Sequence, residues 1–426
     1  MNQFAQLVGR QLAADVRSLP ARLRAALSGQ ARLARCQNIA DVRALARRVV
    51  PDAVFDFVDG AANDEVTAGR NQSDFAALQL HPRVLVDVEQ VDLSTTVLGQ
   101  PVALPLLGAP TGLTGLIHHR GEAAIARAVQ AAGSIYVLSA MASYSIEEIA
   151  REAPGPTWFQ LYVWRDRGLV RELVGRARAA GHGALVLTVD VPRAAVRERD
   201  RRNGFGIPPR LTLRSLGQGM VRPRWSAGFV RHPRMSIANA AGHGGGARDA
   251  VSLTEYINSQ FDPTLSWHDV AWLREEWSGP LLIKGILHPE DAVQAVSAGV
   301  DGVIVSNHGG RQLDHAPSAI SALPRVVEAV GGRAEVLLDG GVRRGADVLK
   351  ALALGARACL VGRPLVYGVG AGGDAGAERA LTILRDELSI AMALAGCPAV
   401  ADVDGGRLVG APAGAPASLQ PTGGPT

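Results

Sequence analysis

The sequence predicts a TIM barrel, a closed sheet of eight parallel strands alternating with helices, with a long insertion after the fourth strand. Short apolar runs, several of them β-branched, occur at 102–109, 134–139, 157–162, 184–190, 281–285, 302–307, 335–339 and 358–362. Helical patterns separate most of these runs, as at 120–132, 168–180, 289–298, 318–330 and 344–354. This alternation indicates parallel βα units, and eight strands close the barrel.

Composition agrees with a globular chain. The 426 residues are 47% hydrophobic and 20% charged, which excludes a disordered protein. No run of about 18 apolar residues lacks a charge, so no transmembrane helix is expected. Three cysteines, Cys36, Cys359 and Cys397, have no paired spacing. They argue against a disulfide framework or a zinc ribbon and favour a reducing, cytoplasmic setting.

The segments that flank the barrel have their own patterns. Residues 1–37 predict a basic amphipathic arm that packs on its own domain or a neighbouring subunit, with a membrane-surface helix as the alternative. Two short helices are expected within 38–60, and the barrel is expected to fill 38–404. The Gly/Pro/Ala-rich residues 405–426 predict a disordered tail.

The insertion, residues 193–265, is strongly basic. Residues 193–234 carry eleven arginines against Glu198 and Asp200, a net charge of +9 in a chain whose total is +4. Such a zone indicates an anionic partner, and the alternative is a solvated basic lid over the active site. Few aromatic residues accompany the arginines, which disfavours nucleic acid. Apolar residues that could anchor the insertion in a membrane are Leu211, Leu213, Leu216, Met220, Val221, Trp225, Phe229 and Val230.

Polar residues, with a few glycines and a proline, stand at the C-terminal end of nearly every predicted strand. In chain order these strand-end residues are Pro110, Thr111, Gly112, Ser139, Gln160, Tyr162, Thr188, Asp190, Lys284, Ser306, Asn307, His308, Asp339, Gly362 and Arg363. Because active sites of this fold lie at the C-terminal ends of the strands, these groups predict one converging pocket.

The last two strand ends predict a phosphate site. Asp339 to Arg343 follow the seventh strand, and Gly362 and Arg363 follow the eighth. TIM barrels commonly bind phosphate at these two loops. Glycines such as Gly341 let backbone N–H groups approach the anion, and an arginine adds a bidentate charge.

Lysine is rare in this chain, which makes Lys284 informative. Of 44 basic residues only Lys284 and Lys350 are lysines. Lys350 lies in a helical pattern and is read as a solvated charge. Lys284 lies in an apolar strand and must face an anion, form a Schiff base, or stabilise negative charge on a flavin ring. Three neutral groups offer the hydrogen bonds that a flavin edge requires: Ser139, Gln160 and Thr188.

His308 is the candidate base. Two glycines follow it and allow a close approach to a ligand, and imidazole is the usual base at neutral pH. Asp190, across the barrel, could hold the histidine tautomer. Arg311 and Arg197 could bind a substrate carboxylate bidentately. Together these residues predict proton abstraction from an acid substrate beside an electron acceptor.

These residues carry a family resemblance. The segment 306–314, Ser-Asn-His-Gly-Gly-Arg-Gln-Leu-Asp, resembles the active-site signature of the FMN-dependent 2-hydroxy-acid oxidases and dehydrogenases. Further matches follow in the family's order at 159–162, 187–190, 283–285, 338–345 and 361–364. The resemblance covers about 38–400, and it implies oxidation of an L-2-hydroxy acid to the 2-keto acid with FMN.

The resemblance also implies roles. His308 would be the base and Asp190 its partner, while Tyr162 would meet the substrate oxygen. Arg311 and Arg197 would bind the carboxylate. The residues implied to hold FMN are Pro110, Thr111, Gly112, Ser139, Gln160, Thr188, Lys284, Ser306, Asp339, Gly341, Arg343, Gly362 and Arg363. Lys284 among them would face flavin N1, and Met141 would shape the wall of the substrate pocket. No metal is expected.

The chain departs from the family at Phe57, where a tyrosine usually donates to the substrate carboxylate. The loss of one hydroxyl donor costs about 0.5–1.5 kcal/mol for a neutral bond and more for a bond to a charged group. Two arginines remain for the carboxylate. We therefore expect altered binding rather than lost chemistry, and a substrate other than simple lactate.

Within the family the chain looks like the membrane-associated lactate and mandelate dehydrogenases. Gly112 stands where the oxidases tend to have alanine, and 222–225 and 229–232 resemble a membrane-binding segment. The resemblance implies a homotetramer, electron transfer to a quinone, and a peripheral place on the inner face of the cell membrane. The alternatives are an oxidase that reduces O2 to H2O2 and another FMN barrel enzyme, such as an isomerase or an enzyme of secondary metabolism.

Overall fold

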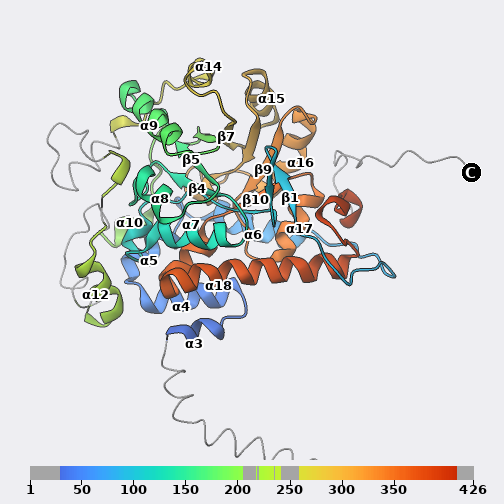
Figure 1. Ribbon diagram of the computed structural model, residues 1–426, viewed down its shortest axis with the longest axis horizontal. Coiled ribbons are helices and arrows are strands. Elements are labelled where there is room, and N and C mark those ends of the chain that lie inside the picture. Colours follow the sequence, from blue (N-terminus) through green and yellow to red (C-terminus); the bar gives the residue numbers. More distant parts are fainter. Residues whose placement is uncertain (1–28, 205–216, 218–219, 235, 241–258, 410–426) are drawn as a thin grey trace, which may run out of the picture.

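The computed structural model describes residues 29–204, 217, 220–234, 236–240 and 259–409. Its centre is a closed parallel barrel in the order β10-β3-β4-β5-β6-β7-β8-β9 (Figure 1). The strands are β3 (Leu106–Gly108), β4 (Tyr136–Ser139), β5 (Thr157–Leu161), β6 (Leu185–Thr188), β7 (Leu281–Ile286), β8 (Gly302–Val305), β9 (Glu335–Asp339) and β10 (Ala358–Val361). The predicted TIM barrel is confirmed.

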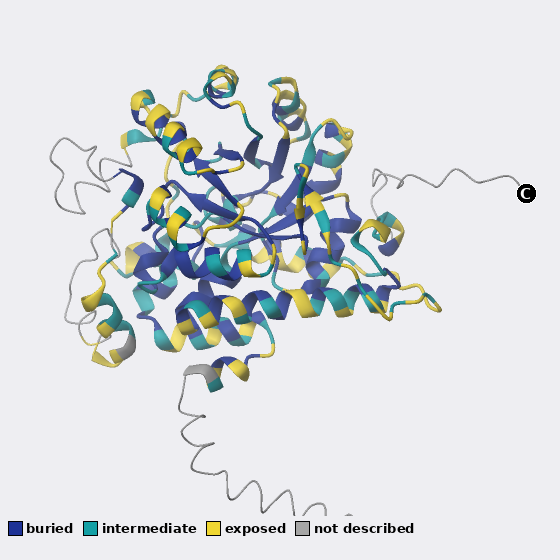
Figure 2. Ribbon diagram, viewed as in Figure 1, coloured by how far each residue is buried: buried dark blue, intermediate teal, exposed yellow. Residues whose placement is uncertain are grey.

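The strands read as continuous apolar runs because helices cover the outside of the barrel and side chains fill its inside. Figure 2 shows the barrel strands as the buried centre, with exposed residues mostly on the outer helices and loops. The interior cluster includes Leu107, Val137, Val186 and Ile304. The barrel is therefore a packed core whose strand ends can hold polar groups in fixed positions.

The first predicted strand, 102–109, is wrong at its beginning. A hairpin of β1 (Thr95–Val97) and β2 (Gln100–Val102) precedes β3. Leu98 and Gly99 both have positive φ, as a two-residue hairpin turn requires. Val97 and Val102 pack with the barrel interior, so the apolar run continues without a break although the strand does not.

The helices expected between the strands are present as α7 (Gly121–Ala131), α9 (Arg167–Ala179), α15 (Pro289–Ser297), α16 (Ala319–Val330) and α17 (Gly345–Ala353). The two short helices expected within 38–60 are α4 (Ile39–Val49) and α5 (Asp52–Asp59). Further described helices outside the insertion are α3 (Gly29–Ala34), α6 (Val66–Ala77), α8 (Ile146–Glu152), α14 (Trp267–Glu276) and α18 (Arg363–Ala395), and α18 is kinked at Gly372 and Gly373. Figure 1 shows α18 as a long helix between the barrel and α4. Lys350, expected to be solvated, is buried in α17, and its Nζ donates to Phe75 O at 2.7 Å.

The flanking predictions meet the structure only in part. Most of the arm, residues 1–28, lies outside the described residues. The expected tail begins too early, because a 3₁₀ helix spans Gly405–Arg407 and Leu408 pairs with Leu80. Buried Arg407 donates to Ala395 O at 3.2 Å, which ties this segment to the end of α18. Residues 410–426 lie outside the described residues.

The described parts of the insertion are α10 (Glu198–Arg202), α12 (Pro223–Arg231) and the 3₁₀ helix Ala238–Ala240. Trp225 and Phe229, expected as membrane anchors, instead stack with ring centroids 4.7 Å apart and pack on the barrel core. Trp225 Nε1 also donates to Leu116 O at 3.1 Å. Both rings are only partly buried, so the role expected for them as membrane anchors stays a prediction. Leu211, Leu213 and Leu216 lie outside the described residues.

Candidate active site

A cavity of about 560 Å³ opens at the C-terminal ends of the strands. The predicted residues that line it are Phe57, Pro110, Thr111, Gly112, Met141, Tyr162, Arg197, Lys284, His308, Arg311, Asp339, Gly341, Arg343, Gly362 and Arg363. The remaining predicted residues, Ser139, Gln160, Thr188, Asp190 and Ser306, do not line it. All but Asp190 are almost fully buried. The structure thus brings residues from across the whole chain to one place.

His308 and Asp190 form a close pair. His308 Nδ1 lies 2.9 Å from Asp190 Oδ1. Burial would raise the pKa of Asp190, but the charges of His308 and Lys284 outweigh it and hold the pKa below its ordinary value. An ionised Asp190 accepts a hydrogen bond, so it favours the tautomer with a proton on Nδ1. The Nε2 atom of His308 is then free to act as a base.

The backbone of His308 is held in an unusual conformation. Its φ is 58°, a left-handed value that non-glycine residues seldom adopt, and its N–H donates to Ser306 Oγ at 3.0 Å. Gly310 follows with φ 75°, and a Cβ there would lie 2.7 Å from Ala68 N. Strain of this kind persists where the surroundings fix it, and it occurs often at functional sites. The packing of α6 against this turn explains the glycine at position 310.

Arg311 and Arg197 form a cationic face of the cavity. Arg311 Nη1 donates to Phe57 O at 2.8 Å and to Gly60 O at 2.9 Å, and among the described residues no carboxylate pairs with it. Arg197 Nε binds Asp200 Oδ2 at 2.7 Å. Burial, then the charges of Arg197 and Arg363, lower the pKa of Arg311. A buried guanidinium beside other cations is suited to a bound anion.

Phe57 lies under both of these guanidiniums. Its ring centroid is 5.4 Å from Cζ of Arg311 and 5.8 Å from Cζ of Arg197, within the range of a cation–π interaction. The ring therefore supports the cations without offering a hydroxyl donor. Tyr162 faces the same cavity, and burial and the charge of Asp190 raise the pKa of its phenol. Tyr162 consequently keeps its proton and can donate.

Lys284 has a carboxylate partner. Its Nζ lies 2.7 Å from Asp339 Oδ2 and 2.9 Å from Ser306 Oγ, and Ser306 Oγ also donates to Asp339 Oδ2 at 2.9 Å. Burial would lower the pKa of Lys284, but the charges of Asp339 and Asp190 raise it. Lys284 therefore remains a cation at the floor of the cavity.

The loops after β9 and β10 leave room for an anion. Gly341 has φ 93°, and a Cβ there would lie 2.0 Å from Asn71 O, so only glycine fits. The buried guanidinium of Arg343 donates to Val342 O at 2.8 Å, and burial lowers its pKa. Gly362 precedes α18, whose N-terminus adds a favourable dipole. Arg363 differs, because the carbonyls of Val58, Gly60 and Gly309 already bind its guanidinium.

Several buried polar atoms in and behind the cavity wall have no hydrogen-bond partner among the described residues, and they include Thr111 Oγ1, Thr188 Oγ1 and Gln160 Nε2. Gln160 is oriented by its Oε1, which accepts from Ser139 Oγ at 3.0 Å. A buried polar atom without a partner costs about 1–3 kcal/mol, so a ligand with complementary edges would stabilise this wall. Such atoms above a phosphate cradle fit a flavin mononucleotide.

Asn71 gave no sequence signal, whereas its partner Asn307 stands among the predicted strand-end residues. Asn71 and Asn307 exchange two side-chain hydrogen bonds of 2.8 Å and tie α6 to the His308 turn. They are 236 residues apart, so no local pattern links them. The apolar side of the cavity includes Ile237 and Phe261 from the insertion. The composition of a loop does not indicate which of its residues turn inward.

The sequence of this chain is similar to those of known flavoenzymes. The sequence model of a family described as FMN-dependent dehydrogenase matches residues 46–409. The L-lactate oxidase of Nostoc sp. is 45% identical over 371 residues, which is 86% of this chain and 96% of that protein. The L-lactate dehydrogenase of Caulobacter vibrioides is 45% identical over 368 residues, or 85% of this chain and 95% of that protein.

Two solved structures resemble the chain closely. The monotopic membrane protein (S)-mandelate dehydrogenase has a TM-score of 0.85 and 39% identity, covering 88% of this chain and 99% of that one. A mandelate oxidase crystallised with (S)-2-phenylpropionate has a TM-score of 0.74 and 39% identity, covering 88% and 98%.

Proposed function

We propose residue roles, a substrate side chain, an electron acceptor and a cellular location for this chain, which belongs to the FMN-dependent dehydrogenase family. The chain is an FMN-dependent oxidoreductase that acts on the CH–OH group of a 2-hydroxy acid.

FMN, when bound, supplies the two-electron acceptor for the substrate carbon. We assign its phosphate to Gly341, Arg343, Gly362 and Arg363. We assign its ring to Pro110, Thr111, Gly112, Ser139, Gln160, Thr188 and Lys284, with Ser306 and Asp339 holding Lys284 in place. The unpartnered atoms of Thr111, Thr188 and Gln160 support this assignment.

The substrate carboxylate binds Arg311 and Arg197 over the ring of Phe57. Tyr162 donates to a substrate oxygen, and Met141 forms part of the pocket wall. His308 takes a proton from the substrate through Nε2, and Asp190 stabilises the imidazolium that forms. The observation that carries this proposal is the 2.9 Å pair of His308 and Asp190 beside the cationic face of Arg311.

The test is anaerobic mixing of the holoenzyme with a panel of L-2-hydroxy acids that includes lactate and mandelate, with the D-enantiomers as controls. Loss of the absorbance of the bound flavin with L-acids only is the expected result, and an acid larger than lactate should act better because apolar residues such as Phe57 and Phe261 line the cavity. No bleaching by any acid would contradict the proposed function.

We further propose a quinone as the electron acceptor and an anionic membrane surface as its location. Met220, Val221 and Val230 support this, because they are 81%, 74% and 78% exposed on the basic insertion. Among the described residues, no helix has the length and apolar character to span a membrane. The oxidase alternative predicts stoichiometric H2O2 under air, and the quinone proposal predicts slow reoxidation by air and fast reoxidation by a soluble quinone.

The assembly is proposed from family resemblance alone. We expect a homotetramer, which light scattering of the purified holoenzyme would test.

A further inference from the structure

Residues 57–62, which run from the last turn of α5 into the connection to α6 and are called the loop below, support the active-site arginines through their backbone. Phe57 O and Gly60 O accept from Arg311, and Val58 O and Gly60 O accept from Arg363. Ala62 N donates to Gly310 O at 2.9 Å, which joins the loop to the His308 turn. The position of this loop therefore determines where the Arg311 guanidinium lies.

Asp59 fixes the loop from below. Its buried carboxylate accepts two bonds from Arg43 at 2.6 and 2.7 Å, one from Tyr367 at 2.7 Å and one from Arg199 at 2.9 Å. Burial would raise the pKa of Asp59, but the hydrogen bonds from Arg43, Tyr367 and Arg199 hold the pKa well below its ordinary value. Three different helices, α4, α10 and α18, thus donate to one carboxylate beside the cavity.

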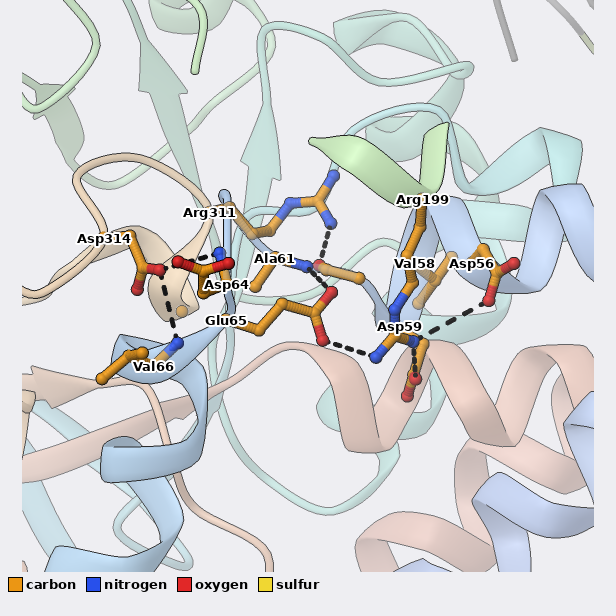
Figure 3. A network of polar contacts seen from close by, with 12 residues as sticks. Asp56, Val58, Asp59, Ala61, Asp64, Glu65, Val66, Arg199, Arg311 and Asp314 are labelled. Carbon is orange, nitrogen blue, oxygen red and sulfur yellow. Dashed lines mark hydrogen bonds and ion pairs between the residues drawn. The ribbon is translucent and has the colours of Figure 1, made fainter. Parts of the chain in front are cut away.

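Arg199 has a second carboxylate on the other side of its guanidinium. It binds Glu65 as well as Asp59, and Figure 3 shows it reaching both. Glu65 Oε1 in turn accepts from Ala61 N at 3.0 Å, so Arg199 contacts the loop at both ends. Asn203, at the end of the same helix, donates to Asp56 at 2.7 Å.

Arg199 does not line the cavity, but its neighbour does. Arg197 immediately precedes α10 and faces the cavity, and Val196 O accepts from Asn63 N at 3.0 Å. Docking α10 on the loop therefore places Arg197 beside Arg311. The two cations come from chain segments more than a hundred residues apart, and Arg199 joins the segment of Arg197 to the loop that binds Arg311.

We propose that Arg199, held by Asp59 and Glu65, is a positioning residue that sets the spacing between Arg197 and Arg311 and so the affinity for the substrate carboxylate. This inference rests on the proposed role of those two arginines. Moving either arginine to reach a carboxylate would cost free energy. Two arginines that already have the correct spacing before the substrate binds therefore bind it more tightly.

The experiment compares Arg199→Gln and Arg199→Lys with a matched control, Arg202→Gln. Arg202 lies on the same helix, its side chain is 73% exposed, and its ion-pair partner among the described residues is Glu198, so its variant removes the same charge without touching the loop. The measurements are the Kd of (S)-2-phenylpropionate and of pyruvate for the oxidised holoenzyme, by titration of flavin absorbance. The second readout is KM and kcat for the most reactive 2-hydroxy acid.

Arg199→Gln should raise both Kd values and KM by about tenfold, which corresponds to ~1.4 kcal/mol, and leave kcat within about threefold. Arg199→Lys should fall between wild type and Arg199→Gln, because ammonium cannot bridge two carboxylates as the planar fork does. Arg202→Gln should match wild type. Kd values within twofold of wild type in Arg199→Gln, or equal shifts in Arg199→Gln and Arg202→Gln, would overturn the proposal.

Loss of fold is separated from loss of positioning by flavin retention and melting temperature. If Arg199→Gln loses FMN, the variant Asp59→Asn replaces it. The asparagine oxygen can still accept a hydrogen bond, but it lacks the negative charge that binds Arg199. This variant should raise the same Kd values. Failure of the proposed function has a different signature. In that case wild type would bind the carboxylates without being reduced by any 2-hydroxy acid, and the Kd comparison would still decide the role of Arg199.

Discussion

The strand-end cavity and the basic insertion are attached to the same barrel in different ways. Around His308, each polar side chain is fixed by contacts from distant segments, as the pairs His308–Asp190 and Asn71–Asn307 show. The described part of the insertion around α12 is attached by a few contacts, which include the packing of Trp225 and Phe229, the His119–His232 stack and the Arg222–Asp52 ion pair at 2.6 Å, while its outer residues are exposed. The difference indicates that proton transfer requires a rigid frame, whereas contact with a surface requires an accessible face.

The largest expected effect tests the rigid region. His308→Ala should retain FMN, because the unpartnered polar atoms of the wall are untouched, but flavin reduction should slow by about 10²–10⁴-fold, the usual contribution of a general base. Anaerobic stopped-flow absorbance measures the rate. His315→Ala, just past the signature and outside the cavity lining, is the control. A near-normal rate of flavin reduction in His308→Ala would show that His308 is not the base.

The second test addresses the insertion. We expect co-sedimentation with anionic vesicles but not with neutral ones, and release as salt rises, because each basic group near an anionic leaflet contributes about 1 kcal/mol and salt screens it. Replacing Met220, Val221 and Val230 together by serine should weaken the binding and leave flavin reduction unchanged. Equal recovery in the supernatant with both vesicle types at low salt would favour a solvated basic lid, and it would weaken the quinone assignment.

The seam between the two regions is expected to be sensitive to acid. His118 and His119 in the barrel stack with ring centroids 4.3 Å apart, and His119 stacks with His232 of the insertion at 5.1 Å. Burial, then the charge of His119, lower the pKa of His118 to about 4. The unfolded chain then binds this proton first, near pH 6.5, and the folded chain only near pH 4.

The free energy of unfolding should therefore fall as pH falls from about 6.5 to about 4, with His118 contributing a slope of up to ~1.4 kcal/mol per pH unit. Denaturant unfolding at a series of pH values measures the slope. His118→Asn should show a shallower slope in that window and the same slope above it. An unchanged slope in the variant would assign the acid sensitivity to other groups.

The sequence predicted the residues of the strand-end cavity far better than the residues that hold them in place. Strands buried on both faces leave apolar runs, and polar residues at their C-terminal ends lie in or near one cavity, so His308, Lys284 and Arg343 could be found without coordinates. The supports pair across long separations and leave no periodicity, as for Asn71 with Asn307, Arg199 with Glu65, and Lys350 with Phe75 O. The contact of Trp225 with Leu116 O could not be predicted, because apolar residues on a basic loop look alike whether they face the barrel or the solvent.

The smallest expected effect concerns Phe57, where the two regions meet over the substrate. Its ring supports Arg311 from the barrel and Arg197 from the insertion. Phe57→Tyr keeps that ring and adds one hydroxyl donor toward the carboxylate, so lactate should bind more tightly by about 0.5–1.5 kcal/mol, roughly 2- to 10-fold in Kd. Titration of the oxidised holoenzyme with pyruvate and the KM for lactate measure the gain. Phe57→Leu is the matched control, since it removes the ring without adding a donor and should weaken binding.

If binding in Phe57→Tyr is unchanged or worse for every acid in the panel, the natural substrate uses the apolar face of Phe57. In that case the departure at this position selects the substrate side chain rather than weakening the hold on its carboxylate.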